Sequence, residues 1–163
     1  GESPASFNAG NVGTVVRYNI SVNDGLRTRP TRVGMFSPLI HLAGPVKNTT
    51  IWRNIIHAGK KTIKEADRSM MTFDSWGGYS DSTFVKENIF YTPEISTFNF
   101  TESTNNVFED NYYLGAFKVK PADPGAQTVS GVYRFSALMD TVAVAGSEGV
   151  FVNEKAIREF FER

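Results

Sequence analysis

Short apolar runs separated by turn-forming residues are the feature that most constrains the fold of this chain. Strand-like runs occur at 69–75, 83–91, 95–101, 111–120, 127–139, 141–145 and 150–152. Spacers such as WGGYSDS at 76–82 and KPADPG at 120–125 are rich in residues that favour turns. The 13 Phe, 6 Tyr and 2 Trp residues also favour strands. This pattern predicts a mainly β fold, which is an antiparallel β-barrel or a sandwich.

The segment 14–23, TVVRYNISVN, alternates apolar and polar residues and predicts one half-buried strand. The side chains expected on its buried face are Val16, Tyr18, Ile20 and Val22. The segment 32–44 is apolar but contains Pro38, which indicates a bulged edge strand or a buried loop.

Two segments are candidates for helices. The internal segment 51–68 predicts either a helix or a pair of strands joined near Gly59, which weakens the helical pattern. The terminal segment 153–163 predicts an amphipathic helix, in which Asn153 is the N-cap and Ile157, Phe160 and Phe161 form an apolar stripe. We expect this helix to close one end of the barrel or to pack on its sheet, and a partner-binding helix is the alternative.

Length and composition suit one domain over residues 1–163, with residues 1–11 as a flexible lead and no evident internal repeat. The chain has no cysteine, which excludes disulfides, thiol catalysis and cysteine-based zinc sites. It carries 17 basic and 17 acidic residues, so no general attraction to nucleic acid is expected. No apolar run approaches the length of a transmembrane helix, and no signal-peptide pattern is visible. The sequence leaves the compartment open.

Motifs that would indicate a particular reaction are weak. His41 lies in an apolar context that favours a hydrogen-bonded core residue, and His57 has no carboxylate in its local sequence. The basic residues between positions 47 and 68 favour a solvated face, with contact to phosphate or RNA as the alternative. No motif indicates a metal or another cofactor. Sequons for N-glycosylation occur at Asn19, Asn48 and Asn99, and the sequence does not decide whether any is modified.

The stretch DPGAQTVSGVYRFSALMDTVAVAGSEGVF, from Asp123 to Phe151, resembles the allene oxide cyclase barrel family and its dirigent relatives. The matching residues are Asp123, Gly125, Val129, Gly131, Tyr133, Asp140, Thr141, Ala143, Val144, Gly146, Gly149 and Phe151. The early segment YNISVND is also similar to the first strand of that family, through Tyr18, Ile20 and Asp24.

The resemblance implies a barrel that holds a small molecule, with Tyr18, Tyr133 and Asp140 as the candidate ligand-binding residues. Tyr18 and Tyr133 would line the pocket or donate hydrogen bonds, and Asp140 would be a polar anchor or a turn residue. The chain departs from the cyclases at Asn19 and Ser21, where those enzymes have Glu and Asn. The carboxylate that steers epoxide opening is therefore absent, and catalytic residues remain unassigned.

The sequence leads to two functional hypotheses. The first is binding of a hydrophobic or aromatic small molecule inside the barrel, guiding its cyclisation or coupling in the manner of a metal-free cyclase or isomerase. The second is a self-assembling structural subunit, such as a viral coat or surface-layer protein. Both are compatible with a homo-oligomer, and neither requires nucleic acid or a membrane span.

Overall fold

The computed structural model describes residues 10–22, 24, 27–32, 34–59, 61, 68–126, 143–146 and 149–152. Within these ranges every regular element is a β-strand, and most strands have only two to four residues. Four parallel sheets form the body of the structure, and a separate two-stranded sheet follows it.

Sheet 1 contains β1 (Asn11–Val12), β5 (Val46–Lys47), β9 (Ser80–Asp81) and β13 (Ser103–Thr104). Sheet 2 contains β2 (Val15–Arg17), β6 (Thr50–Trp52), β10 (Phe84–Lys86) and β14 (Val107–Glu109). Sheet 3 contains β3 (Ile20–Val22), β7 (Ile55–His57), β11 (Ile89–Tyr91) and β15 (Tyr112–Leu114). Sheet 4 contains β4 (Ile40–Ala43), β8 (Met71–Asp74) and β12 (Phe98–Phe100).

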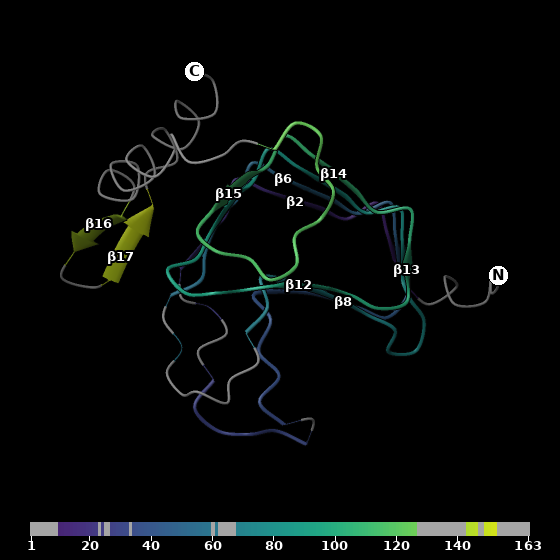
Figure 1. Cartoon of the computed structure of the whole chain (residues 1–163), viewed down its shortest axis with the longest axis horizontal. Helices are drawn as coiled ribbons and strands as arrows, with labels where there is room; N and C mark the ends of the chain where they lie inside the picture. The colour runs from purple at the N-terminus through teal and green to yellow at the C-terminus, as the bar shows by residue number, and fades with distance from the viewer. Residues whose placement is uncertain are drawn as a thin grey trace.

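The strand order defines a parallel β-helix. The chain visits sheets 1, 2, 3 and 4 in turn and then returns to sheet 1, where β5 pairs with β1 in parallel. Figure 1 looks along the axis of this coil, so strands of one sheet lie over one another. Neighbouring coils therefore stack at the usual strand separation of about 4.8 Å.

The prediction of an antiparallel barrel or sandwich is wrong, because strands in the four sheets of the body pair only in parallel. The expected helix over 51–68 is also wrong for its first seven residues, which form most of β6 and all of β7. The connection between these two strands consists of Arg53 and Asn54 and does not lie near Gly59. The predicted helix at 153–163 lies outside the described residues.

Two bends in each coil depend on residues with positive φ. One bend joins sheet 1 to sheet 2, and its positive-φ residues are Gly13, Asn48, Ser82 and Asn105. The other joins sheet 2 to sheet 3, and its positive-φ residues are Tyr18, Arg53, Glu87 and Asp110. A left-handed backbone costs a non-glycine residue about 1–2 kcal/mol, so the surrounding structure has to stabilise these bends.

A ladder of four asparagines, of which Asn54, Asn88 and Asn111 are fully buried, stabilises the second bend. Each positive-φ residue there is followed by asparagine, at Asn19, Asn54, Asn88 and Asn111. The Oδ1 atom of Asn88 accepts hydrogen bonds from the backbone N and Nδ2 of Asn54, at 3.0 and 2.9 Å. Its own Nδ2 donates to the carbonyl oxygens of Ile51 and Lys86. The same pattern links all four rungs, so the ladder holds successive coils in one register.

The interior of the coil is filled by apolar side chains. Fully buried members include Phe73, Phe90, Phe98, Met71 and Val85. Their rings pack edge to face or stacked, as between Phe90 and Phe98 at 5.2 Å. In the described part of the coil the rings therefore pack against one another.

The segment 115–126 closes the end of the coil that faces the viewer in Figure 1. Its first residues extend sheet 4, since Ser96 and Phe98 donate to the carbonyls of Ala116 and Val119. Phe117 and Ala126 then pack against the core. Asp123 ends the asparagine ladder, because its Oδ2 accepts from the backbone N and Nδ2 of Asn111 at 3.1 and 2.8 Å.

The remaining two strands, β16 (Ala143–Gly146) and β17 (Gly149–Val152), pair antiparallel. They correspond to the strand-like runs predicted at 141–145 and 150–152.

Candidate interaction surface on the outer face of sheet 2

The outer face of sheet 2 carries an exposed apolar row. The inward residues of these strands, such as Ile51 and Val85, are buried, so their neighbours point outward. The register places the outward residues in line as Val15, Thr50, Phe84 and Val107. Val15, Phe84 and Val107 are 55%, 42% and 44% exposed, which is high for residues of regular strands.

A second outward row runs beside the first and combines an indole ring with charges. Its members, in register, are Arg17, Trp52, Lys86 and Glu109. The guanidinium carbon of Arg17 and the Nζ atom of Lys86 each lie 5.9 Å from the Trp52 ring centroid. Both contacts fall within the range of cation–π attraction.

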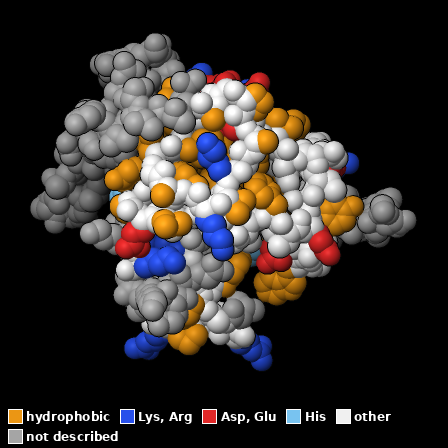
Figure 2. Space-filling model, in the orientation of Figure 1, with side chains coloured by type: hydrophobic (Ala, Val, Ile, Leu, Met, Phe, Trp, Pro, Cys, Tyr) orange, Lys and Arg blue, Asp and Glu red, His pale blue; other side chains and the backbone are white. Residues whose placement is uncertain are grey.

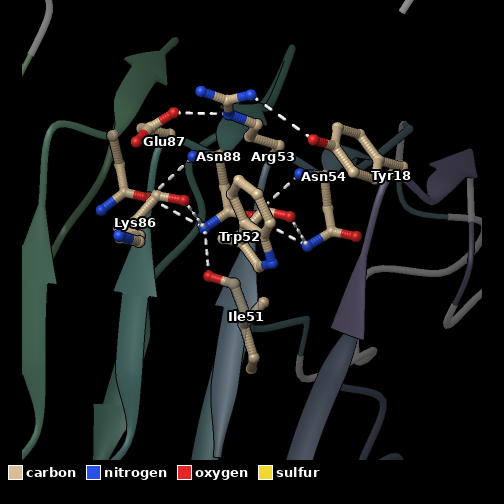
Figure 3. A network of polar contacts seen from close by, with 9 residues as sticks. Tyr18, Ile51, Trp52, Arg53, Asn54, Lys86, Glu87 and Asn88 are labelled. Carbon is tan, nitrogen blue, oxygen red and sulfur yellow. Dashed lines mark hydrogen bonds and ion pairs between the residues drawn. The ribbon is translucent and has the colours of Figure 1, made fainter. Parts of the chain in front are cut away.

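The positive-φ residues of the adjoining bend form a third row, of which Figure 3 shows Tyr18, Arg53 and Glu87. Arg53 donates through Nε to Glu87 Oε2 at 2.6 Å and through Nη1 to the Tyr18 hydroxyl at 3.4 Å. The hydrogen bond to Glu87 is the main cause that raises the pKa of Arg53 above its ordinary value. The Arg53 guanidinium also lies 4.9 Å from the Trp52 ring, and the Tyr18 ring lies 5.3 Å from it.

We name these three rows together the Trp52 face. Its members are Val15, Thr50, Phe84, Val107, Arg17, Trp52, Lys86, Glu109, Tyr18, Arg53, Glu87 and Asp110. The face contains an aromatic centre, an apolar row and equal numbers of cationic and anionic side chains. Such a composition suits contact with a macromolecule better than it suits bond-breaking chemistry.

Of the three ligand-binding residues expected from the sequence, the structure describes one, Tyr18. Tyr18 lies on the Trp52 face, where its ring contacts Trp52 and its hydroxyl accepts from Arg53. Tyr133 and Asp140 lie outside the described residues. Asp123, which entered only through the family resemblance, terminates the asparagine ladder and also accepts from the Tyr113 hydroxyl at 3.0 Å.

The two histidines do not form a catalytic centre with described residues. His41 is an exposed residue whose Nε2 lies 3.3 Å from Asp74 Oδ2, so the expected core position is wrong. His57 stacks on Tyr91 with ring centroids 4.9 Å apart. Burial lowers the pKa of His57, and the nearby Arg68 guanidinium lowers it further. Within the ranges that the structure describes, no three His, Asp or Glu side chains are grouped to hold a metal.

The described basic residues between 47 and 68 lie in different environments. Arg53 is bound to Glu87, and Lys47 lies 3.5 Å from Asp81. Arg68 is buried and donates to the backbone carbonyls of Gly59 and Asp24. Arg68 therefore does not belong to the expected solvated face, and Lys60 and Lys64 lie outside the described residues. Figure 2 shows basic and acidic side chains scattered over the side that it displays, some of them next to each other.

The three sequons occupy different environments. Asn19 is a rung of the ladder, and its Nδ2 donates to the Arg17 carbonyl and to Asn54 Oδ1. Asn99 is half-buried and donates to Thr72 Oγ1 at 3.3 Å. Asn48 is exposed at a positive-φ bend. A glycan on Asn19 or Asn99 would displace these contacts, which leaves Asn48 as the accessible position.

Comparisons with known proteins identify no relative. No family model, curated protein or solved structure matches the chain. The described residues contain no helix long and apolar enough to cross a membrane. The geometry of the Trp52 face therefore carries the functional argument.

Proposed function

We propose that the chain is a structural module that associates with further copies of itself through the Trp52 face. The observation that carries this proposal is the exposed row Val15, Phe84 and Val107 beside Trp52 on a regular sheet. Contiguous apolar surface rimmed by polar groups is characteristic of protein–protein contacts. Tryptophan, tyrosine and arginine, which surround this row, are the residues most enriched at such contacts.

The small-molecule function expected from the sequence has less support. It requires an enclosed space, whereas the described coil is filled with side chains such as Phe73, Phe90 and Phe98. The second hypothesis, a self-assembling subunit, requires an outer surface that another copy can cover. A parallel β-helix supplies such a surface, because its rows of outward side chains repeat in register from coil to coil.

The charges of the Trp52 face favour another copy as the partner. The cations Arg17, Arg53 and Lys86 are matched in number by the carboxylates Glu87, Glu109 and Asp110. A partner of a single charge, such as nucleic acid, would be attracted by half of these groups and repelled by the other half. A second copy brings both signs.

We expect sedimentation velocity to show reversible association of the wild-type chain as its concentration rises. The contact is smaller than a standard interface, because its four strands extend about 14 Å along the coil axis. A dissociation constant on the order of 100 µM is therefore expected. A chain that stays monomeric up to millimolar concentration would refute the proposal.

Replacing Phe84 with glutamate should abolish this association, because the variant places a charge in the centre of the apolar row. The weakening of the dissociation constant should be at least about 30-fold, since an unpaired charge would have to be desolvated. The matched control is Ile95→Glu, at a residue that is 68% exposed and lies outside the three rows. If Ile95→Glu weakens association as much as Phe84→Glu, the contact is not on the Trp52 face.

A further inference from the structure

The order of charges on the Trp52 face defines how two copies fit together. Along the coil axis the second row runs Arg17, Trp52, Lys86, Glu109, from β2 to β14. The bend beside it runs Tyr18, Arg53, Glu87, Asp110. Each row thus begins with a cation or a ring and ends with a carboxylate. When either row is laid against its own reversed copy, its cations and rings face carboxylates or cations of the opposite end.

We propose that two copies pack face to face about a two-fold axis parallel to the strands, which passes between β6 and β10. This register rests on the proposed self-association and adds its geometry. Such an axis retains position along the strands and reverses the order of the coils. The first coil of one copy therefore lies on the fourth coil of the other, and the second lies on the third.

Every outward row is complementary to itself under this operation. Arg17 of one copy lies opposite Glu109 of the other, and Trp52 lies opposite Lys86. In the bend, Arg53 lies opposite Glu87, and the Tyr18 hydroxyl lies opposite the Asp110 carboxylate. In the apolar row, Val15 lies opposite Val107, and Phe84 lies opposite Thr50. Each contact occurs twice, as a closed two-fold interface requires.

Alternative arrangements lose this match. Two copies related by a two-fold axis parallel to the coil axis reverse position along the strands, and with that axis on the second row Arg17 would lie opposite Arg17 and Glu109 opposite Glu109. Like charges facing each other across an interface are strongly unfavourable. The end of the coil is a poorer contact, because segment 115–126 covers the end where Asp123 caps the ladder.

Charge reversal at one pair tests the register. Arg17→Glu would face Glu109 of the second copy, and Glu109→Arg would face Arg17, so each variant alone should associate at least about tenfold more weakly than the wild type. The double variant restores opposite charges and should return to within about threefold of the wild type. Both positions are exposed, so the fold should be retained and can be checked by circular dichroism.

Mixing the two single variants gives the sharpest result. Each variant alone should associate weakly, but in the mixture the carboxylate introduced by Arg17→Glu would meet the guanidinium introduced by Glu109→Arg. The unchanged Glu109 of the first variant would meet the unchanged Arg17 of the second. The equimolar mixture should therefore form a heterodimer with an affinity close to that of the wild type. In a Trp76→Phe background, Trp52 is the single indole of each copy, and its emission should change on pairing with Lys86.

The outcomes separate the register from the association itself. If the mixture and the double variant remain monomeric while the wild type dimerises, the two-fold register is overturned. If Phe84→Glu prevents association but Arg17→Glu does not, the face still associates but in another register. If the wild type forms an open series of oligomers instead of a dimer, the contact is head-to-tail and the two-fold axis is excluded.

Discussion

Replacing Asn88 with alanine should lower the free energy of unfolding by about 4 kcal/mol, which is a large value for a single substitution. The Asn88 side chain is fully buried and takes part in five hydrogen bonds. Alanine would leave the backbone N–H of Asn54 and the carbonyl of Ile51 without these partners. An unsatisfied buried polar group costs about 1–3 kcal/mol, so two or three of them account for the expected loss.

Urea unfolding of the two proteins measures this loss directly. Asn99→Ala is the matched control, because Asn99 is half-buried and its side chain makes a single hydrogen bond at 3.3 Å. That variant should lose less than about 1 kcal/mol. Equal losses in the two variants would mean that the ladder contributes no more than an ordinary asparagine.

Replacing Asp123 with alanine should lower the free energy of unfolding by about 3 kcal/mol, because the ladder then loses its final acceptor. Asp123 Oδ2 accepts from the backbone N–H and side-chain amide of Asn111 and from the Tyr113 hydroxyl. Asn111 is fully buried, so water cannot easily replace the carboxylate. Asp74→Ala removes a carboxylate whose side chain is 42% exposed and should change stability by no more than about 0.5 kcal/mol. A similar loss at both positions would contradict a capping role.

The Tyr113 hydroxyl gives the same cap a dependence on pH. Burial raises the pKa of Tyr113 above its ordinary value of 10.0, and the Asp123 carboxylate raises it further. As the pH rises above about 10, the unfolded chain loses the phenolic proton while the folded chain keeps it. Stability from this group is complete below about pH 10 and is lost above it, at up to about 1.4 kcal/mol per pH unit. Urea unfolding between about pH 9 and about pH 11.5 should show a smaller alkaline loss in Tyr113→Phe, and an equal slope in both proteins would contradict the assignment.

Strand content could be predicted from the sequence, but the way the strands connect could not. Alternation over 14–23 indicated one strand with Tyr18 and Val16 on the same face. The structure bends at Tyr18, where φ is 55°, and the chain passes from sheet 2 to sheet 3. A two-residue period contains no information about such a bend, because the alternation resumes on the other side of it.

The repeat was missed for a related reason. The four ladder asparagines occur at intervals of 35, 34 and 23 residues, so no single period describes them. The available signal was local: VVRYNIS, TIWRNII, FVKENIF and VFEDNYY each place asparagine after a strand and before another apolar residue. Of the candidate site, Tyr18 was selected from the sequence, whereas Trp52 was not. Its outward position follows from the register of β6, which composition does not reveal.

The two bends also divide the molecule into a part of fixed length and a part of variable length. In every coil, the positive-φ position after sheet 2 follows the one before it by five positions, with four residues between them. The difference between a 35-residue and a 23-residue coil is therefore taken up elsewhere, in the connections that pass through sheet 4. An insertion between Asn48 and Arg53 would move every following rung, while one near the exposed residues Arg29 and Thr31 would only lengthen a loop. We therefore expect insertions to be tolerated in the connections that pass through sheet 4, and a grafted peptide would be accommodated there.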